Sequence, residues 1–162
     1  MFPMKIKQFF KTIPAVLALA FAGPAAAKDS GTLDVYWVDV EGGAATLLVS
    51  PNGESLLVDT GFPSPDNRDA ERIFAATQEA GITRIDTLVI THFHRDHVGG
   101  LQALAEMIPI GRCVDHGTNT EESNQQWVDA YLRVCREKRA AVGPGERIPF
   151  GPVSYTHLRA HE

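Results

Sequence analysis

The stretch THFHRDH, residues 91–97, places three histidines and one aspartate within seven residues. Imidazole and carboxylate groups are the ligands of catalytic zinc, and iron and manganese accept similar groups. In an extended loop, side chains two residues apart point to the same side, so His92 and His94 are placed to converge on one ion. His97 is out of that phase, and together with Asp96 it is placed to serve a second ion nearby. The spacing therefore predicts a metal centre.

The strands expected around this motif place it at the edge of a sheet. Residues 84–90, RIDTLVI, are apolar at their end, as in a buried strand, and the motif follows them directly. Loops at the carboxyl ends of strands are where open α/β sheets carry their sites. Upstream, residues 33–40 predict a strand, and residues 44–50 and 54–59 predict a hairpin around a PNG turn. A further strand is expected near residues 110–114.

Two helices are expected between these strands and a third after the last of them. Ser64 followed by proline is typical of a helix opening, and Gly81 is typical of the end of that helix. After the motif, a short helix is expected because four apolar residues lie on one of its faces: Leu101, Leu104, Ala105 and Ile108. The last helix is expected over residues 121–138. Hairpins followed by helices that alternate with strands predict a mixed α/β layered fold.

The sequence THFHRDHVGGL, with LLVDTG at residues 56–61 upstream, resembles the metallo-β-lactamase superfamily. That family combines His-x-His-x-Asp-His, small residues and a helix with an upstream Asp-Thr-Gly that ends a strand. The resemblance covers residues 33–151, and its specific motifs lie within residues 59–101. Within the superfamily, residues 38–61 look most like the group that includes the nuclease-like domain of DNA-uptake proteins. That group opens with an Asp-Val-Gly turn, where this chain has Glu41.

The resemblance implies an α/β fold, the N-terminal portion of an αββα sandwich of two similar halves with metals at one edge. His92 and His94 would bind a first metal, Asp96 and His97 would bind a second, and Asp59 would orient the motif loop. The implied cofactor is Zn²⁺, two ions, with iron or manganese as alternatives. The family's further ligands, a histidine, a metal-bridging aspartate and a last histidine, normally follow a PGERIPFG-like segment.

The implied activity is that of an exported metal-dependent hydrolase. A metal-bound hydroxide would attack an ester, lactone, amide or phosphodiester bond, and Asp96 would also accept a proton from the attacking water. The acidic charge of the chain favours small neutral or cationic substrates over polynucleotides. Two alternatives stay open: a non-catalytic metal-binding or interaction protein, and an iron-dependent redox member of the same fold.

Several other residues have two interpretations. His116, which follows the strand expected near residues 110–114, is a candidate further ligand or substrate contact, or else a loop histidine with an ordinary hydrogen bond. Asp115 beside it is a weaker candidate, and Arg95 is expected to be a surface charge at a variable position of the motif. Cys113 and Cys135 either form a disulfide or remain two buried thiols, and the sequence leaves both open.

Residues 1–27 are expected to be a secretory signal. Lys5, Lys7 and Lys11 make the start positive, an apolar stretch follows at residues 13–22, and the segment ends on three alanines. The apolar stretch is well short of the roughly 20 residues that span a bilayer. The mature protein would then begin at Lys28, be periplasmic or secreted, and need no membrane. Its net charge changes from −5 to −8 when the three lysines are removed. Such a charge disfavours stable nucleic-acid binding.

Residues 152–162, PVSYTHLRAHE, match the in-frame translation of a widely used transposase sequencing adapter. We expect this segment to be an artefact of library preparation, so that His157 and His161 are not ligands. The metallo-β-lactamase-type domain would then span residues 28–151 and be incomplete at its C-terminus. Such a chain is expected to expose apolar faces, to bind metal weakly and to be inactive by itself. The sequence does not indicate an oligomeric state.

Overall fold

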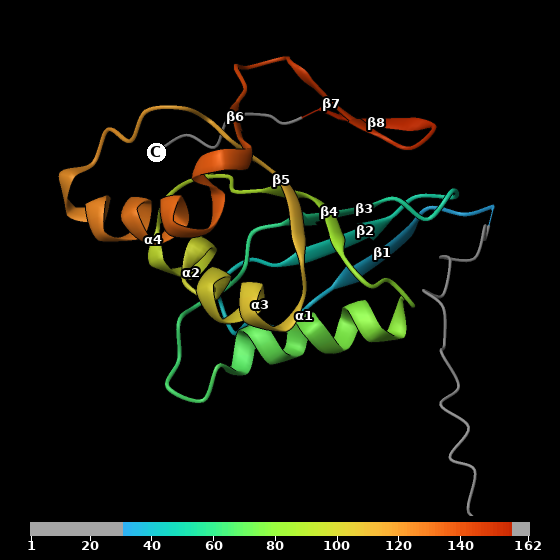
Figure 1. The fold of residues 1–162 in the computed structure, drawn as a ribbon, viewed down its shortest axis with the longest axis horizontal. Coiled ribbons are helices and arrows are strands. Elements are labelled where there is room, and N and C mark those ends of the chain that lie inside the picture. The colour runs from blue at the N-terminus through green and yellow to red at the C-terminus, as the bar shows by residue number, and fades with distance from the viewer. Residues whose placement is uncertain (1–30, 157–162) are drawn as a thin grey trace, which may run out of the picture.

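The structure is a computed structural model that describes residues 31–156, so the expected signal at residues 1–27, His157 and His161 lie outside it. Six strands form one sheet in the order β1-β2-β3-β4-β5-β6 (Figure 1). The strands are β1 (Asp34–Trp37), β2 (Thr46–Val49), β3 (Ser55–Val58), β4 (Ile85–Val89), β5 (Ile110–Asp115) and β6 (Arg139–Ala141). This mixed α/β architecture confirms the expected fold class.

The sheet has an antiparallel half and a parallel half. Strands β1, β2 and β3 pair antiparallel, with Leu48 opposite Leu56, which confirms the hairpin expected around the PNG turn. Strands β3, β4, β5 and β6 pair parallel, with Val58 opposite Val89 and Val89 opposite Val114. Since the parallel strands end at one edge, the loops after β3, β4 and β5 lie next to one another there.

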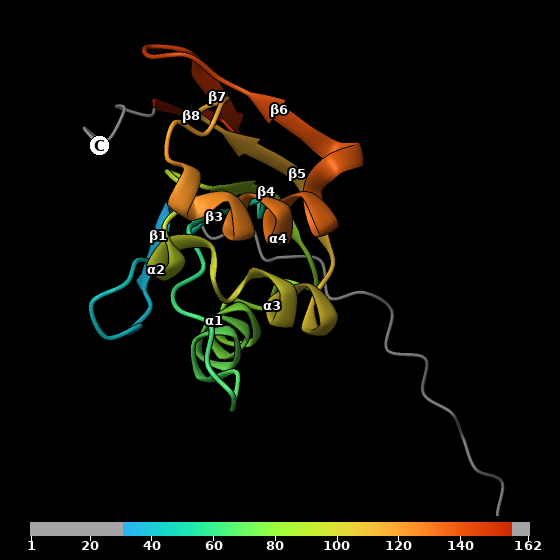
Figure 2. The ribbon, with the colours of Figure 1, turned by 90° about the vertical axis from the view of Figure 1, so that its left-hand side faces the viewer.

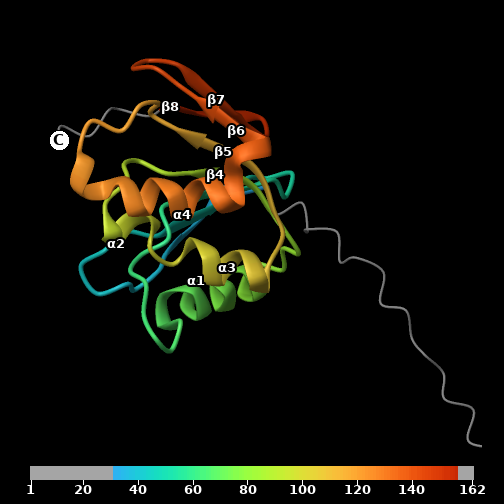
Figure 3. The ribbon, with the colours of Figure 1, turned by 60° about the vertical axis from the view of Figure 1, so that its left-hand side comes forward.

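The helices cover one face of the sheet, as Figures 1 and 3 show. They are α1 (Arg68–Glu79), α2 (Arg95–Val98), α3 (Leu101–Met107) and α4 (Gln125–Cys135), with short 3₁₀ turns η1 (Glu122–Asn124) and η2 (Arg136–Lys138) around α4. Their apolar side chains form one core with Leu47, Leu57 and Leu88 of the sheet. The face expected on α3 is confirmed for Leu101 and Leu104, which are fully buried.

The opposite face of the sheet meets a two-stranded hairpin, β7 (Arg147–Phe150) and β8 (Val153–Thr156). Ile148 and Phe150 of β7 are buried against Leu56, Val89 and Val114. Figure 2 shows the hairpin and the helices on opposite sides of the sheet. This face is therefore covered over its parallel half. Strand β8 lies in the segment expected to be foreign, whose origin stays a prediction.

Apolar surface remains exposed on β1. Trp37 is 82% exposed, Leu33 46% and Val35 36%. Val35 and Trp37 alternate with Tyr36, which packs against the helix-covered core, so they belong to the opposite face. Among the described residues, this part of the sheet thus exposes apolar side chains, which agrees with the expectation of exposed apolar surface.

Some expected boundaries were wrong. Helix α1 begins at Arg68 rather than beside Ser64, because residues 64–67 form a turn in which the Ser64 hydroxyl accepts the Arg68 N–H. The motif is not one extended loop, because Asp96 and His97 lie on helix α2. Strand β6 was not expected at all.

Cys113 of β5 and Cys135 of α4 form a disulfide, which settles the question that the sequence left open. Both residues are fully buried, and their Cα atoms are 5.7 Å apart. The bond ties α4 to the sheet. Within residues 31–156 no helix has the length and apolar content needed to cross a bilayer.

Candidate metal centre

Three consecutive strands bring the expected site residues to one edge of the sheet. Asp59 directly follows β3, the His-x-His-x-Asp-His motif follows β4, and His116 follows β5. The backbone N–H of Asp59 donates to the Val89 carbonyl at 2.8 Å, which joins the first two of these segments. Parallel pairing therefore assembles residues that are up to 57 positions apart in the sequence.

The three motif histidines lie together. The ring centroids of His92 and His94 are 4.5 Å apart, and those of His92 and His97 are 3.9 Å apart. Asp96 lies beside them, with its Oδ2 3.4 Å from Nε2 of His97. Phe93, between the first two histidines in sequence, points the other way and is 2% exposed in the core. The expectation that His92 and His94 share a side agrees with this alternation.

Asp59 is the buried anchor of the motif. Its side chain is almost fully buried, and its φ of 60° lies in the left-handed region, which aspartate tolerates better than most residues. Oδ1 accepts the Thr91 N–H at 2.8 Å, while Oδ2 accepts the Thr91 hydroxyl at 2.7 Å and contacts Nδ1 of His97 at 2.8 Å. These contacts connect Asp59 to both ends of the motif, while its role in orienting the motif for a metal stays a prediction.

These contacts assign the tautomers of two histidines. An ionised carboxylate only accepts hydrogen bonds, so Nδ1 of His97 carries the proton toward Asp59 and Nε2 keeps its lone pair. The Thr91 hydroxyl donates to Asp59, so Nδ1 of His92 donates to that hydroxyl oxygen at 3.0 Å. The lone pair of His92 is then also on Nε2. Both rings present an unprotonated nitrogen, the form that binds metal.

Glu121 fixes the tautomer of His94 in the same way, and it was not among the site residues expected from the sequence. Its Oε2 is 3.0 Å from Nε2 of His94, which therefore donates and leaves the lone pair on Nδ1. The amide of Asn124 donates to the same oxygen at 2.6 Å, and the amide of Asn119 donates to the Glu121 carbonyl at 2.7 Å. A carboxylate 27 residues downstream carries no motif, and only the pairing of β4 with β5 brings it here.

The surroundings shift the pKa of two motif histidines in opposite directions. Burial, followed by the neighbouring His97 and His94 rings, lowers the pKa of His92 and favours its neutral form. Burial alone would lower the pKa of His97 as well. The hydrogen bond and charge of Asp59, with the charge of Asp96, outweigh burial and raise the pKa of His97.

The donor chemistry fits a divalent metal, but the rings are packed more closely than a bound ion allows. Two imidazoles on one tetrahedral zinc, with Zn–N near 2.1 Å, have centroids roughly 5 Å apart. His92 and His94 are at 4.5 Å. Accordingly, within the described part of the chain no three His, Cys, Asp or Glu side chains are arranged to hold a metal ion as they stand. A shift of about half an ångström in this pair would admit one.

Close backbone packing fixes helix α2 against the loop that carries Asp59. The N–H and hydroxyl of Thr60 both donate to the His97 carbonyl, at 2.7 Å and 3.0 Å. A side chain at Gly99 would collide with Pro63, and one at Gly100 with the Thr60 carbonyl. The small residues that follow the motif therefore have a steric role, since only glycine permits this approach.

The other candidates lie outside the cluster of motif side chains. The His116 ring lies 5.2 Å from the ring of Phe93, on the core side of the motif loop. Asp115 is fully buried, and its oxygens bind the guanidinium of Arg139 and accept the Tyr131 hydroxyl. Arg95 is exposed and lies over the Phe62 ring at 5.4 Å. Both interpretations of His116 stay open, whereas the contacts of Asp115 are those of a structural residue.

Comparison with known proteins identifies the family. The model of the metallo-beta-lactamase superfamily matches residues 38–157. The chain therefore belongs to the metallo-beta-lactamase superfamily, as the motif between β4 and α3 indicated.

Individual relatives are similar over shorter stretches. The anti-Pycsar protein Apyc1 of Paenibacillus xerothermodurans is 43% identical over 60 residues, which are 36% of this chain and 20% of that protein. A UPF0173 metal-dependent hydrolase of Cupriavidus necator is 29% identical over 84 residues, 52% of this chain and 27% of that protein. These matches span less than a third of each relative.

Solved structures show the same fold. The metallo-beta-lactamase SMB-1 in complex with mercaptoacetic acid aligns with a TM-score of 0.55 at 23% identity, over 74% of this chain and 48% of that one. The metallo-beta-lactamase fold protein YhfI of Bacillus subtilis aligns with a TM-score of 0.51 at 17% identity, over 78% and 52%. The chain thus spans about half the length of these structures.

Proposed function

We propose that this chain is the metal-binding portion of a metal-dependent hydrolase that acts on a small molecule. The observation that carries the proposal is the set of three fixed tautomers. Thr91, Glu121 and Asp59 each engage one ring nitrogen, on His92, His94 and His97 respectively, and the other nitrogen keeps a lone pair. Such outer hydrogen bonds are typical of metal-binding histidines.

His92 and His94 would hold one zinc ion, and Asp96 with His97 would hold a second. Metal bound there supplies Lewis acidity for hydrolysis at neutral pH. The chain's own residues supply orientation: Asp59 and Glu121 fix the rings, and the motif backbone is held against Thr60. Asp96 is partly exposed and is the carboxylate placed to accept a proton from an attacking water.

The relatives support this assignment at low identity, since one is named a metal-dependent hydrolase. The test uses the natural gene product, obtained by sequencing and cloning the source DNA beyond codon 151. Zinc-dependent hydrolysis of ester, lactone, amide and phosphodiester probes is expected, and His94→Ala is expected to abolish it. Unchanged turnover and metal content in that variant would contradict the mechanism. Metal binding without turnover of any probe would favour a non-catalytic role, and bound iron would favour a redox role.

We also propose that the protein is exported to the periplasm or secreted. The disulfide between Cys113 and Cys135 supports this, because such bonds persist mainly in oxidising compartments. Cell fractionation of the natural host, followed by mass spectrometry of the N-terminal peptide, tests the proposal. An N-terminus at Lys28 in the exported fraction is expected, and intact protein confined to the cytoplasm would refute export.

A further inference from the structure

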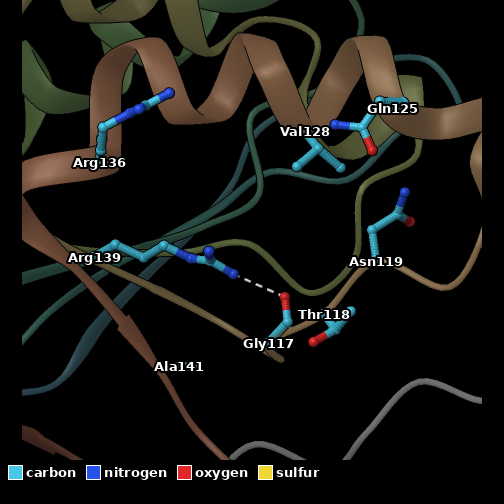
Figure 4. Close-up of a pocket in the computed structure, with 8 residues that line it drawn as sticks. All are labelled: Gly117, Thr118, Asn119, Gln125, Val128, Arg136, Arg139 and Ala141. Atoms are coloured by element: carbon cyan, nitrogen blue, oxygen red, sulfur yellow. Dashed lines mark hydrogen bonds between the residues drawn. The ribbon is translucent and has the colours of Figure 1, made fainter.

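A pocket of about 640 Å³ lies between helix α4, strand β6 and the loop after β5 (Figure 4). None of its lining residues is acidic, and two are arginines. The lining comprises Gly117, Thr118, Asn119, Gln125, Val128, Arg136, Arg139 and Ala141. The whole chain has a net charge of −5, so this pocket is a positive region on an acidic protein.

Arg139 is held in a fixed position at the wall of the pocket. Its Nε and Nη2 atoms bind the two oxygens of Asp115 at 2.6 Å and 2.8 Å, and Nη2 also donates to the Gly117 carbonyl at 2.8 Å. Asp115 is itself fixed, since it is buried and accepts the Tyr131 hydroxyl at 2.8 Å. Nη1 of Arg139 takes part in none of these bonds. Its N–H groups therefore stay available to a ligand, at little further cost in side-chain entropy.

Arg136 provides the excess charge. Asp115 balances Arg139, whereas Arg136 forms no ion pair with any residue in the described range 31–156. Figure 4 shows Arg136 at one end of the pocket, with Asn119 and Gln125 at the other. The amide of Gln125 is held by Asp129 at 2.9 Å, which orients it on α4. A planar oxyanion matches the fork of a guanidinium group, because two parallel N–H donors meet two oxygens.

The pocket and the metal centre share one loop. Asn119 lines the pocket and donates to the carbonyl of Glu121, whose carboxylate holds His94. Asn119 and Glu121 are two positions apart, so the pocket adjoins the segment of the chain that holds His94.

We propose that this pocket binds an anionic group of the substrate, a carboxylate or a phosphate, while the metal centre acts on a bond elsewhere in the same molecule. The role as a substrate subsite rests on the proposed hydrolase function. It also refines the expectation from overall charge, which favoured neutral or cationic substrates. At contact distance the positive charge of Arg136 acts directly on a bound anion. The repulsion from more distant acidic residues is screened by salt and matters less.

Binding can be measured without hydrolysis. Inorganic phosphate and acetate are titrated separately into the metal-free full chain, in EDTA at low salt, and backbone amide shifts are followed by NMR. Shifts at Gly117 and Thr118 are expected. Arg136→Gln is expected to lower the affinity for the preferred anion about fivefold, which is the usual effect of removing one exposed charge contact. Arg133 is an exposed arginine of the adjoining helix α4 that lies outside the lining, so Arg133→Gln is the matched control and is expected to bind as the wild type does.

The two anions separate phosphate from carboxylate recognition. Absence of shifts at the pocket with both anions, or equal affinity in Arg136→Gln and the wild type, would overturn the proposal. Weakening by Arg133→Gln to the same extent would also overturn it, since the effect would then reflect general charge.

Hydrolysis of matched esters separates this proposal from the proposed function. The zinc-loaded full-length gene product is given 4-nitrophenyl acetate, which is neutral, and mono(4-nitrophenyl) succinate, which is anionic. A higher kcat/KM for the succinate ester is expected, and Arg136→Gln is expected to reduce that value about fivefold without affecting the acetate ester. Equal use of both esters, unaffected by the substitution, would overturn the pocket proposal and leave the hydrolase standing. Anion binding that depends on Arg136, with neither ester hydrolysed, would support the anion site and overturn the hydrolase.

Discussion

Replacing Asp59 with asparagine tests how the motif is held in its metal-binding form. Asparagine has nearly the same shape and tolerates the positive φ of 60° at this position, so backbone strain is not introduced. Its Oδ1 continues to accept the Thr91 N–H. In place of Oδ2, however, an NH₂ group faces Nδ1 of His97 and donates. His97 must then accept on Nδ1 and carry its proton on Nε2, the nitrogen proposed for metal.

Two magnitudes follow from these contacts. Loss of the hydrogen bond between His97 and an ionised, buried acceptor lowers the free energy of unfolding of the metal-free chain by about 1.5–3 kcal/mol. Displacing the lone pair from Nε2 weakens zinc binding about 10–100-fold, the usual effect of losing an outer partner of a metal-binding histidine. The two effects are separable, because stability is measured in EDTA and affinity by competition with a chelator.

Urea denaturation and a zinc competition titration are therefore run on wild type, Asp59→Asn and Asp86→Asn. Asp86 is the matched control, since its carboxylate accepts the Ser55 N–H and hydroxyl, both at 3.0 Å, at the other end of β4. Asp86→Asn is expected to lose stability but to keep its zinc affinity within about twofold. Wild-type zinc affinity in Asp59→Asn, or an equal loss in both variants, would refute the assigned role of Asp59.

Three further predictions follow from the same structure. Glu121→Gln introduces an amide oxygen that can still accept the hydrogen bond from His94, so zinc affinity should fall only a few-fold, whereas Glu121→Ala should lower it about tenfold or more. Equal zinc affinity in the wild type and both variants, measured by chelator competition, would show that this contact does not contribute to zinc binding. Replacing both Cys113 and Cys135 with alanine should lower the free energy of unfolding by about 3 kcal/mol, measured in urea against the oxidised wild type, and an unchanged midpoint would contradict a stabilising disulfide. Sequencing the source DNA through codon 151 should show a continuing frame with a histidine, an aspartate and a last histidine, and a stop codon there would remove the basis for a dinuclear centre.

The strands and the motif were predictable because their signals are local. Alternation and turn residues indicated the hairpin of β2 and β3, and the apolar residues 84–90 indicated the buried strand β4. The motif residues and Asp59 were identified by spacing and resemblance, and the structure brings them to one sheet edge. The start of helix α1 was misplaced because Ser64, four residues before Arg68, accepts the Arg68 N–H in a turn that precedes the helix. Composition alone does not distinguish such a turn from the first turn of a helix.

The parts that were not predicted depend on contacts between distant segments. Glu121 reaches His94 only because β4 and β5 are neighbours in the sheet. Strand β6 is three residues long, and it is defined by its pairing with β5 rather than by its own sequence. The pocket around Arg136 likewise combines a loop, a helix and a strand. Each of these features depends on which strands pair and which segments pack together, and the residue types of one segment do not reveal this.

The most direct test of the metal centre is a zinc titration of the full chain against a chromophoric chelator, comparing wild type with His92→Ala, His94→Ala and His116→Ala. The structure separates the first two histidines from His116, which lies beside Phe93 on the core side of the loop. We predict that the wild type and His116→Ala bind zinc with similar affinity, and that His92→Ala and His94→Ala each lose at least about tenfold. Equal zinc affinity in all four proteins would contradict the assignment of the motif as the metal site.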